Sequence, residues 1–183
     1  MRNRGDRRLL ILNLPVKSAI LGLAMATLIL PYESMATDSS PQVILNVSKA
    51  TPRQVEPLTQ SAVLRDYKFA WGNLAAAEES NSLASLNGLF VGDANARLTQ
   101  EIQSQQKNGM SSRYTNQSHK LEAVFYSPEG DILELHDTAE YDFEVLDGGK
   151  SIHNEHTIVH YVVLMTPGAD RWVIRHLQAV PQF

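Results

Sequence analysis

The sequence predicts an α+β domain in which helices near the N-terminus pack on one face of a curved antiparallel sheet. Three observations support this prediction. Apolar residues recur at helical spacing between residues 58 and 108, and the spacing changes to two after Gly109. The chain then closes with two β-branched and aromatic runs around the turn Pro167-Gly168-Ala169-Asp170. Helices followed by a succession of strands are typical of the α+β class.

Three helices are expected in the first part of the domain. The first covers residues 58–77, and a short second helix covers residues 82–89. The third covers residues 94–108, with Asp93 as its N-cap and Gly109 as the left-handed residue after its end. The apolar face of the first helix consists of Val63, Tyr67, Ala70, Trp71 and Leu74.

Four strands are expected after Gly109, over residues 119–126, 131–146, 152–166 and 171–180. The turns between them are rich in Gly and Pro, and in the last turn Pro167 fixes φ while Gly168 permits a positive φ. The strand over 131–146 alternates strictly, which separates a solvent face from a core face. The polar face consists of Glu134, His136, Thr138, Glu140, Asp142 and Glu144. The apolar face consists of Leu133, Leu135, Ala139, Tyr141, Phe143 and Val145, with Asp137 as its one charged member.

The N-terminus predicts export. Residues 1–36 combine a basic start, an apolar run over 18–30 and small residues before a cleavage point after Ala36, as in a signal peptide. An uncleaved signal anchor, with residues 9–30 in the inner membrane, is the alternative. Both place the rest of the chain outside the cytoplasm, in the periplasm or secreted, because the positive flank stays inside. A flexible leader over 37–57, with at most a short strand at 43–47, then leads to one domain over 58–183.

Charge and composition exclude several classes of function. The first 36 residues hold 5 of the 16 basic and 2 of the 20 acidic residues, which leaves a net charge of −7 beyond Ala36. Nucleic acids and anionic lipids both need a basic surface, so neither is an expected partner. A membrane contact is expected only through an uncleaved N-terminal segment. The chain has no cysteine, which excludes disulfides, thiolate metal sites and a cysteine nucleophile.

The pattern resembles the NTF2-like superfamily, the cone-shaped α+β fold of SnoaL-like proteins and ketosteroid isomerase. The resemblance rests on the helix around Tyr67-Lys-Phe-Ala-Trp71, the long strands and the closing Gly168-Ala-Asp-Arg-Trp172-Val-Ile174. Within the superfamily the chain is most similar to the exported domain of plastid and cyanobacterial division proteins, through His160-Tyr161-Val-Val-Leu and the Trp-x-Ile strand. Members of the superfamily include enzymes, ligand pockets and protein-binding modules, so the fold alone does not assign a function.

Asp137 and His176 are the candidate catalytic residues. A carboxylate on the core face would lie in the cone, where burial is expected to raise its pKa and suit it to act as a general base. His176 follows Trp172 and Ile174 at strand spacing, so it is expected on the same face of the sheet. There it is expected to pair with Asp137. The simpler interpretation of Asp137 is a structural hydrogen bond, or a bulge that turns the carboxylate outward. The simpler interpretation of His176 is a histidine at the edge of the core. A pocket for a small hydrophobic ligand would be lined by Tyr67, Trp71, Asp137, Tyr161 and His176.

No cofactor is predicted. His153, His156 and His160 do not have the spacing of a metal site on a strand, and no His-Glu-x-x-His motif is present. The chain also lacks a phosphate-binding glycine-rich loop and a Gly-x-Ser-x-Gly elbow.

The acidic strand face is the other candidate site. Its members Glu134, Glu140, Asp142 and Glu144 either form a solvated face or bind a basic segment of another protein. The leading hypothesis is therefore an exported, non-catalytic domain that binds a protein partner or forms a homodimer through its sheet. The alternative is an isomerase-like or ligand-binding protein that uses the cone around Asp137 and His176.

Overall fold

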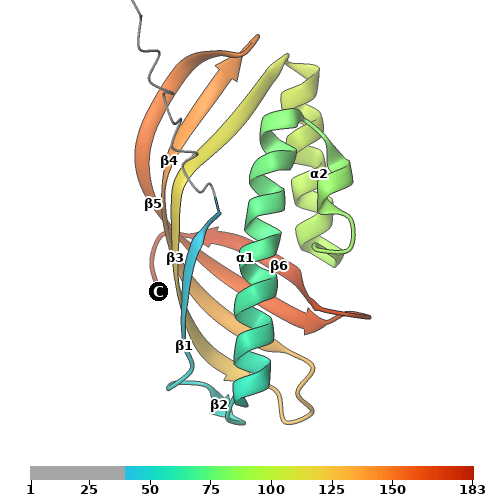
Figure 1. The fold of residues 1–183 in the computed structure, drawn as a ribbon, viewed down its shortest axis with the longest axis vertical. Helices are drawn as coiled ribbons and strands as arrows, with labels where there is room; N and C mark the ends of the chain where they lie inside the picture. Colours follow the sequence, from blue (N-terminus) through green and yellow to red (C-terminus); the bar gives the residue numbers. More distant parts are fainter. Residues whose placement is uncertain (1–39) are drawn as a thin grey trace, which may run out of the picture. The chain divides into compact units, whose positions relative to one another are not determined.

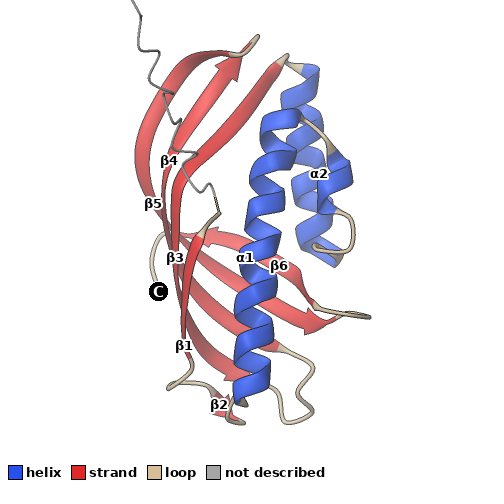
Figure 2. Ribbon diagram, viewed as in Figure 1, coloured by secondary structure: helices blue, strands red, loops and turns tan. Residues whose placement is uncertain are grey.

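A computed structural model describes residues 40–183 of the 183-residue chain. The signal peptide or signal anchor expected in residues 1–36 lies outside these described residues. In the described part, two helices and a short 3₁₀ helix pack on one face of a six-stranded, strongly curved sheet (Figures 1 and 2). This is the α+β arrangement that the sequence predicts. No helix in residues 40–183 combines the length and the apolar character needed to cross a membrane.

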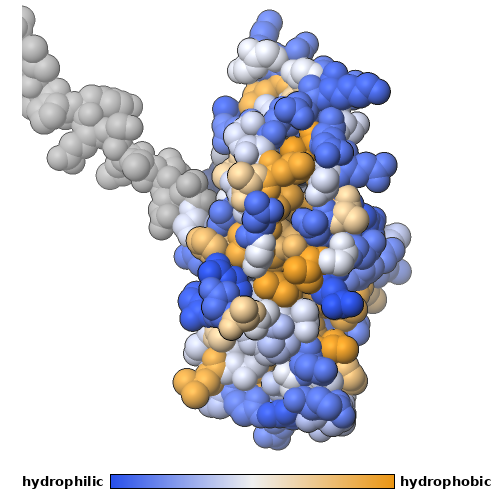
Figure 3. All heavy atoms as spheres, turned by 90° about the vertical axis from the view of Figure 1, so that its right-hand side faces the viewer, coloured by the Kyte–Doolittle hydropathy of each residue, from blue (hydrophilic) through white to orange (hydrophobic). Residues whose placement is uncertain are grey.

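The helices lie close to where the sequence places them. The helix α1 (Pro57–Ser80) is followed by the 3₁₀ helix η1 (Leu83–Leu86) and by α2 (Gly92–Lys107). Val91 is the N-cap of α2, so Asp93 lies in the first turn rather than at the expected cap position. Gly109 has the expected left-handed conformation, with φ of 70°. Figure 3 views the α2 side of the molecule, where apolar side chains are visible between polar ones.

The sheet is larger than the sequence predicts. Its strands are β1 (Gln42–Asn46), β2 (Thr51–Pro52), β3 (Met110–Tyr126), β4 (Leu133–Asp147), β5 (Lys150–Pro167) and β6 (Trp172–Val180). Their order is β1-β3-β4-β5-β6, and β2 pairs with β3 beside β1. From β3 to β6 every pairing is antiparallel, whereas β1 and β2 run parallel to β3.

Part of the expected leader belongs to the folded domain. The short strand expected over 43–47 is present as β1, and it forms one edge of the sheet. Val43, Leu45 and Val47 pack on the hydrophobic core, and Val55 is buried. The segment from Gln42 to Val55 therefore contributes to the sheet and the core and is not a flexible leader.

The strand β3 begins nine residues before its expected start at His119. The additional part, Met110–Ser118, is polar and does not alternate regularly. A bulge interrupts the pairing with β4 between Thr115 and Ser118, and Asn116 has a φ of 53°. Because a bulge shifts the alternation of side chains, the periodicity of this strand is not visible in the sequence.

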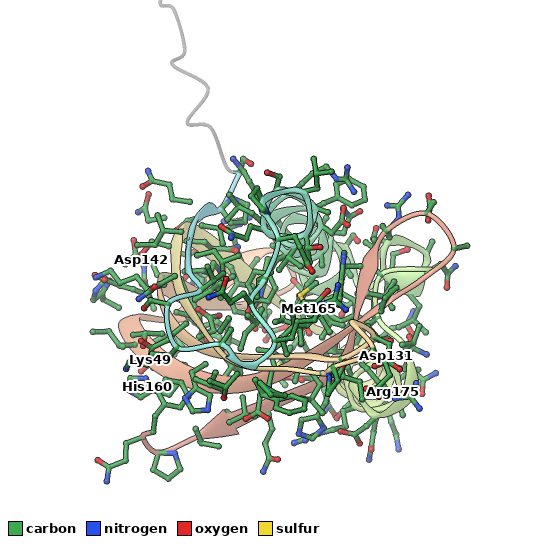
Figure 4. The ribbon with its side chains drawn as sticks, turned by 90° about the horizontal axis from the view of Figure 1, so that it is seen from below. Lys49, Asp131, Asp142, His160, Met165 and Arg175 are labelled. Carbon is green, nitrogen blue, oxygen red and sulfur yellow. The ribbon has the colours of Figure 1, made fainter. Side chains whose placement is uncertain are left out.

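The core lies between the helices and the concave face of the sheet. The apolar face of α1 and the core face of β4 meet there, and the alternation predicted for β4 is confirmed from Leu133 to Tyr141. Met165 lies in this interior, whereas Asp142 and His160 lie at the periphery (Figure 4).

The last hairpin differs from expectation at Gly168. This residue does not have a positive φ. A Cβ at this position would lie 3.0 Å from the carbonyl oxygen of Arg171 and 3.2 Å from Cγ1 of Val173. A side chain at this position would therefore have to displace its neighbours slightly, so glycine is favoured here by the limited space and not by the backbone conformation.

Candidate functional site

Four of the five expected pocket residues come together inside the cone. Tyr67 and Trp71 project from successive turns of α1, while Asp137 on β4 and Tyr161 on β5 are direct cross-strand partners. The ring of Trp71 lies 6.3 Å from that of Tyr67 and 5.5 Å from that of Tyr161, measured between centroids. The apolar face of α1 and the register that sets Asp137 opposite Tyr161 together assemble this cluster.

The buried carboxylate of Asp137 is the centre of a hydrogen-bond network. The hydroxyl of Tyr67 donates to Oδ2 of Asp137 at 2.7 Å, and Nδ1 of His119 lies 2.8 Å from the same oxygen. An ionised carboxylate only accepts hydrogen bonds, so Nδ1 of His119 is the donor in this contact when Asp137 is ionised. Asp137 is 0% exposed and His119 is 1% exposed. Burial, followed by the nearby Asp137 charge, raises the pKa of Tyr67 well above its usual value, so Tyr67 stays protonated and remains a donor.

The network is closed to solvent. The second carboxylate oxygen of Asp137 and Nε2 of His119 are buried and have no hydrogen-bond partner within the described part of the chain. The His119 ring is covered by Trp71, at a centroid distance of 4.4 Å. A general base must reach the proton that it removes, and Asp137 presents no surface to a substrate in this conformation.

His176 does not join this network, contrary to expectation. A bulge in the pairing of β5 with β6 sets Leu164 opposite His176 but Met165 opposite Ile174. This irregularity reverses the alternation, so Ile174 faces the core and His176 does not. The Nδ1 atom of His176 instead lies 2.9 Å from a carboxylate oxygen of Asp93, in the first turn of α2.

His119 occupies the position that the sequence assigns to His176. The sequence contains a signal for this, because His119 has the same parity as Leu121 and Ala123, which are both buried. A histidine on the core face of one strand and a carboxylate on the core face of the next can pair. To predict that His119 pairs with Asp137, one also needs the register of β3 and β4. This register sets Leu121 opposite Asp137, so that His119, two residues before Leu121, lies near the Asp137 carboxylate.

A separate cavity of about 200 Å³ lies between α1, α2 and the concave side of the sheet. Trp71 and Tyr161 belong to its wall, but Asp137, Tyr67 and His176 do not. The expected pocket is therefore divided into a closed polar network and a neighbouring cavity. The other residues that line the cavity are Leu74, Glu78, Ala94, Arg97, Leu98, Glu101, Tyr114, Leu177 and Ala179.

The acidic face lies on the side of the sheet opposite the helices of residues 40–183 (Figure 2), and we call this side the outer face. Glu140 and Asp142 both contact His156 on β5, whose Nε2 lies 3.2 Å from Glu140 and whose Nδ1 lies 2.8 Å from Asp142. Glu144 pairs with Arg113 at 3.1 Å, and Glu134 lies 3.6 Å from His136. Each of the four acids therefore lies next to a basic side chain, and Glu140 and Asp142 share theirs. In residues 40–183, no three His, Asp or Glu side chains are grouped closely enough to hold a metal ion.

Protonation of His156 is expected to depend on Asp142. The hydrogen bond to Asp142 is the main cause that raises the pKa of His156 above its usual value, with Glu140 as a further cause. We expect Asp142→Asn to lower this pKa, because the substitution removes the charge that favours the imidazolium. An NMR titration of the histidine ring protons measures the pKa of His156. Glu134→Gln removes a carboxylate from the same face and is the control. An unchanged His156 pKa in Asp142→Asn would show that the pair is not formed in solution.

The fold is similar to that of a solved structure, the intermembrane space region of the chloroplast protein ARC6. The TM-score is 0.55 and the sequence identity 13%, over 70% of this chain and 98% of the other. At this identity the similarity shows a shared fold, and it agrees with the resemblance to the exported domain of plastid division proteins. No protein-family model matches the sequence, and neither does a curated protein.

Proposed function

We propose that residues 40–183 form an exported, non-catalytic domain that binds another protein, or a second copy of itself, through the outer face of its sheet. The observation that carries the proposal is the composition of this outer face. All helices in the described residues lie on the other side of the sheet (Figure 2). On the outer face, Ile158 is 58% exposed and lies opposite Glu140, and Ile44 is 63% exposed and lies opposite Lys120 of β3.

Exposed isoleucines next to charged side chains are suited to a protein interface. Apolar groups supply the favourable free energy of burial, and the charges select a partner of opposite sign. The outer face therefore fits a partner segment that combines apolar and basic side chains. The similar fold of a region from an intermembrane space supports a role outside the cytoplasm.

The C-terminus supplies one aromatic contact on this face. The ring of Phe183 stacks on His136 at a centroid distance of 4.2 Å and meets the edge of His160 at 5.0 Å. Phe183 remains half exposed. This contact indicates that the outer face can bind an aromatic side chain between β4 and β5.

The alternative function, an isomerase-like activity based on Asp137, has less support. The carboxylate has no exposed surface, and it is separate from the wall of the neighbouring cavity. The hydrogen bonds from Tyr67 and His119 to one oxygen of Asp137 instead link α1, β3 and β4 inside the core, which is a structural role.

Site-specific photo-crosslinking tests the proposed interface. We expect a photoreactive residue at Ile158 to capture a protein, or a second copy of the chain, in envelope extracts. The same residue at Leu58, which is 86% exposed at the start of α1, is the matched control. The double reversal Glu140→Lys and Asp142→Lys is expected to reduce capture at least about tenfold, because like charges then face a basic partner. Equal capture at positions 158 and 58, or capture that charge reversal leaves unchanged, would contradict the proposal.

A further inference from the structure

One edge of the sheet is open along the first half of β5. The pairing of β5 with β6 covers residues 160–167, and Figure 1 shows β6 beside this half of the strand. Residues 150–159 pair with β4 on one side and have no strand on the other side among residues 40–183. We call residues 150–159 the β5 edge. Backbone N–H and C=O groups that point away from β4 are available there to pair with another strand.

The β5 edge is accessible in the described part of the chain. The main contacts of β5 are with β4 and β6, whereas both helices pack mainly on β3 and β6. Residues 150–156 are exposed throughout. The side chains of His153 and Glu155 are 53% and 52% exposed. A strand of another chain can therefore approach this edge along its length.

The other edges of the sheet carry features that limit strand pairing. On β6, Ile174 exchanges backbone hydrogen bonds with Leu89 and Val91, which cover part of that strand. On β3, a bulge between Thr115 and Ser118 interrupts the part that β1 does not cover, and β1 itself is five residues long. Covering segments, bulges and short edge strands all oppose association between edges. The β5 edge is longer than β1, contains no proline, and has its one irregularity toward β4 near its start.

Backbone geometry limits how two copies of the β5 edge can pair. In an antiparallel ladder, successive residues direct their N–H and C=O groups alternately to the two neighbouring strands. Residues that point outward in one copy must therefore lie opposite residues that point outward in the other copy, and all of these have the same parity. A twofold axis between two such strands consequently passes through a residue position and not between two positions.

Charge favours the register that is centred on Asn154. This register pairs residues 150–158 of the two copies and sets His153 opposite Glu155 on both sides of the axis. These two side chains share a face of the strand, because they lie 3.4 Å apart within one copy. An imidazole complements a carboxylate, either as a hydrogen-bond donor or as a cation. The register centred on Glu155 would instead set two carboxylates opposite each other, and registers centred elsewhere pair fewer residues of the edge.

We propose that the chain forms a homodimer in which the β5 edges of two copies pair antiparallel about a twofold axis at Asn154. One continuous sheet then runs through both copies, with the helices of both on the same face. This interface is separate from the outer face and goes beyond the function proposed above. The dimer presents two outer faces side by side, which would strengthen the binding of a partner that carries two matching segments.

Disulfide trapping tests the proposed axis, because the chain has no cysteine of its own. The single substitution Asn154→Cys places two thiols opposite each other, with Cβ atoms about 4.5–5.5 Å apart, close to the separation in a disulfide. We expect mild oxidation of the protein purified from expression of the full chain to give a covalent dimer. In Glu155→Cys the two thiols would lie on the diagonal, about 7–8 Å apart, so this variant is expected to cross-link more slowly. Ala96→Cys, on the exposed side of α2, is the control and is expected to stay monomeric.

Charge reversal tests the pairing without a cysteine. Glu155→Lys sets a lysine opposite His153 and is expected to weaken dimerisation at least about tenfold. The double substitution His153→Glu and Glu155→Lys exchanges the two charges across the axis and is expected to restore the dimer. Sedimentation over a series of protein concentrations measures the dissociation constant, because a dimer follows mass action. Glu129→Lys, in the exposed turn before β4, makes the same change in net charge and is the control.

The same measurements distinguish this interface from the outer face. Glu140→Lys combined with Asp142→Lys is expected to leave the dimer unchanged, although it is expected to reduce capture of a partner by the outer face. Three results would overturn the proposal. The first is a monomer at every concentration up to about 1 mM, and the second is equal cross-linking of Asn154→Cys and Ala96→Cys. The third is a dimer that is weakened by the reversal of Glu140 and Asp142 but not by Glu155→Lys.

Discussion

We expect Asp137→Ala to lower the free energy of unfolding by about 3–5 kcal/mol, as is typical when one partner of a buried, hydrogen-bonded charge is removed. The substitution leaves the Tyr67 hydroxyl and the His119 N–H without an acceptor in the core. Each unsatisfied buried donor costs about 1–3 kcal/mol. Urea unfolding followed by tryptophan fluorescence measures the change, provided that the slope with denaturant is unchanged.

A double-mutant cycle tests whether the network is the cause. Tyr67→Phe alone is expected to cost about 1–2 kcal/mol, because it removes one hydrogen bond to the carboxylate. In the Asp137→Ala background the same substitution is expected to cost almost nothing or to stabilise the protein, because it removes a donor that already lacks a partner. Glu140→Gln, on the outer face of the same strand, is the control and is expected to change stability by less than about 0.5 kcal/mol.

The sign of the stability change in Asp137→Ala also distinguishes a structural role of Asp137 from an isomerase-like activity. A carboxylate kept for catalysis in an apolar site commonly reduces stability, and its removal then stabilises the fold. A carboxylate that joins a helix to two strands does the opposite. Stabilisation by Asp137→Ala would therefore contradict the structural role and favour the isomerase-like alternative.

The burial of Asp137 is predictable because β4 keeps its alternation. Leu133, Leu135 and Tyr141 define the core face on either side of it, and the strand continues from 133 to 145 without an irregularity of its own toward β5. Strict period two in the amino-acid sequence is thus enough to place a charged side chain in the core. The apolar face of α1 places Tyr67 and Trp71 in the same interior by similar reasoning.

The partner of Asp137 is not predictable from the same pattern. His176 lies two residues after Ile174, so in a regular strand both side chains would lie on the same face of the sheet. The bulge between them places the side chain of His176 on the other face. A bulge has no firm signature in the residues here, because Arg175, His176 and Leu177 continue an ordinary strand. His119 has a parity that points inward, yet its meeting with Asp137 depends on the cross-strand register. Register and bulges are set by pairing between distant segments, which a single strand does not encode.

The cavity and the edge strand β1 are unpredictable for a related reason. Glu78 and Glu101 lie on different helices, and only the packing of α1 on α2 and the sheet places both on one wall. The strand β1 pairs with β3 across more than 70 residues, from Gln42 to Ser118. Its short length and the prolines around it favour a leader when it is considered alone, and the parallel pairing becomes visible only in the fold.

Removal of β1 is expected to have the largest effect of any deletion at the start of the domain. We expect a protein that starts at Pro57 to be about 5 kcal/mol less stable than one that starts at Ser40. The shorter protein loses buried Val55 and the half-buried Val43, Leu45 and Val47, and a fully buried aliphatic side chain contributes roughly 1.5–3 kcal/mol. Thermal and urea unfolding of the two proteins measure the difference.

The deletion also exposes the edge of β3, because β1 covers its backbone from Ser118 to Glu122. An uncovered strand edge favours intermolecular pairing, so we expect the shorter protein to aggregate as well.

Two substitutions within β1 distinguish the loss of core packing from the loss of the segment itself. Leu45→Ala, toward the core, is expected to cost about 1–2 kcal/mol, whereas Ile44→Ala, on the exposed side, is expected to stay within about 0.5 kcal/mol. If the shorter protein were as stable as the longer one, residues 40–56 would be a leader after all, and the outer face would lose Ile44 as part of its proposed interface.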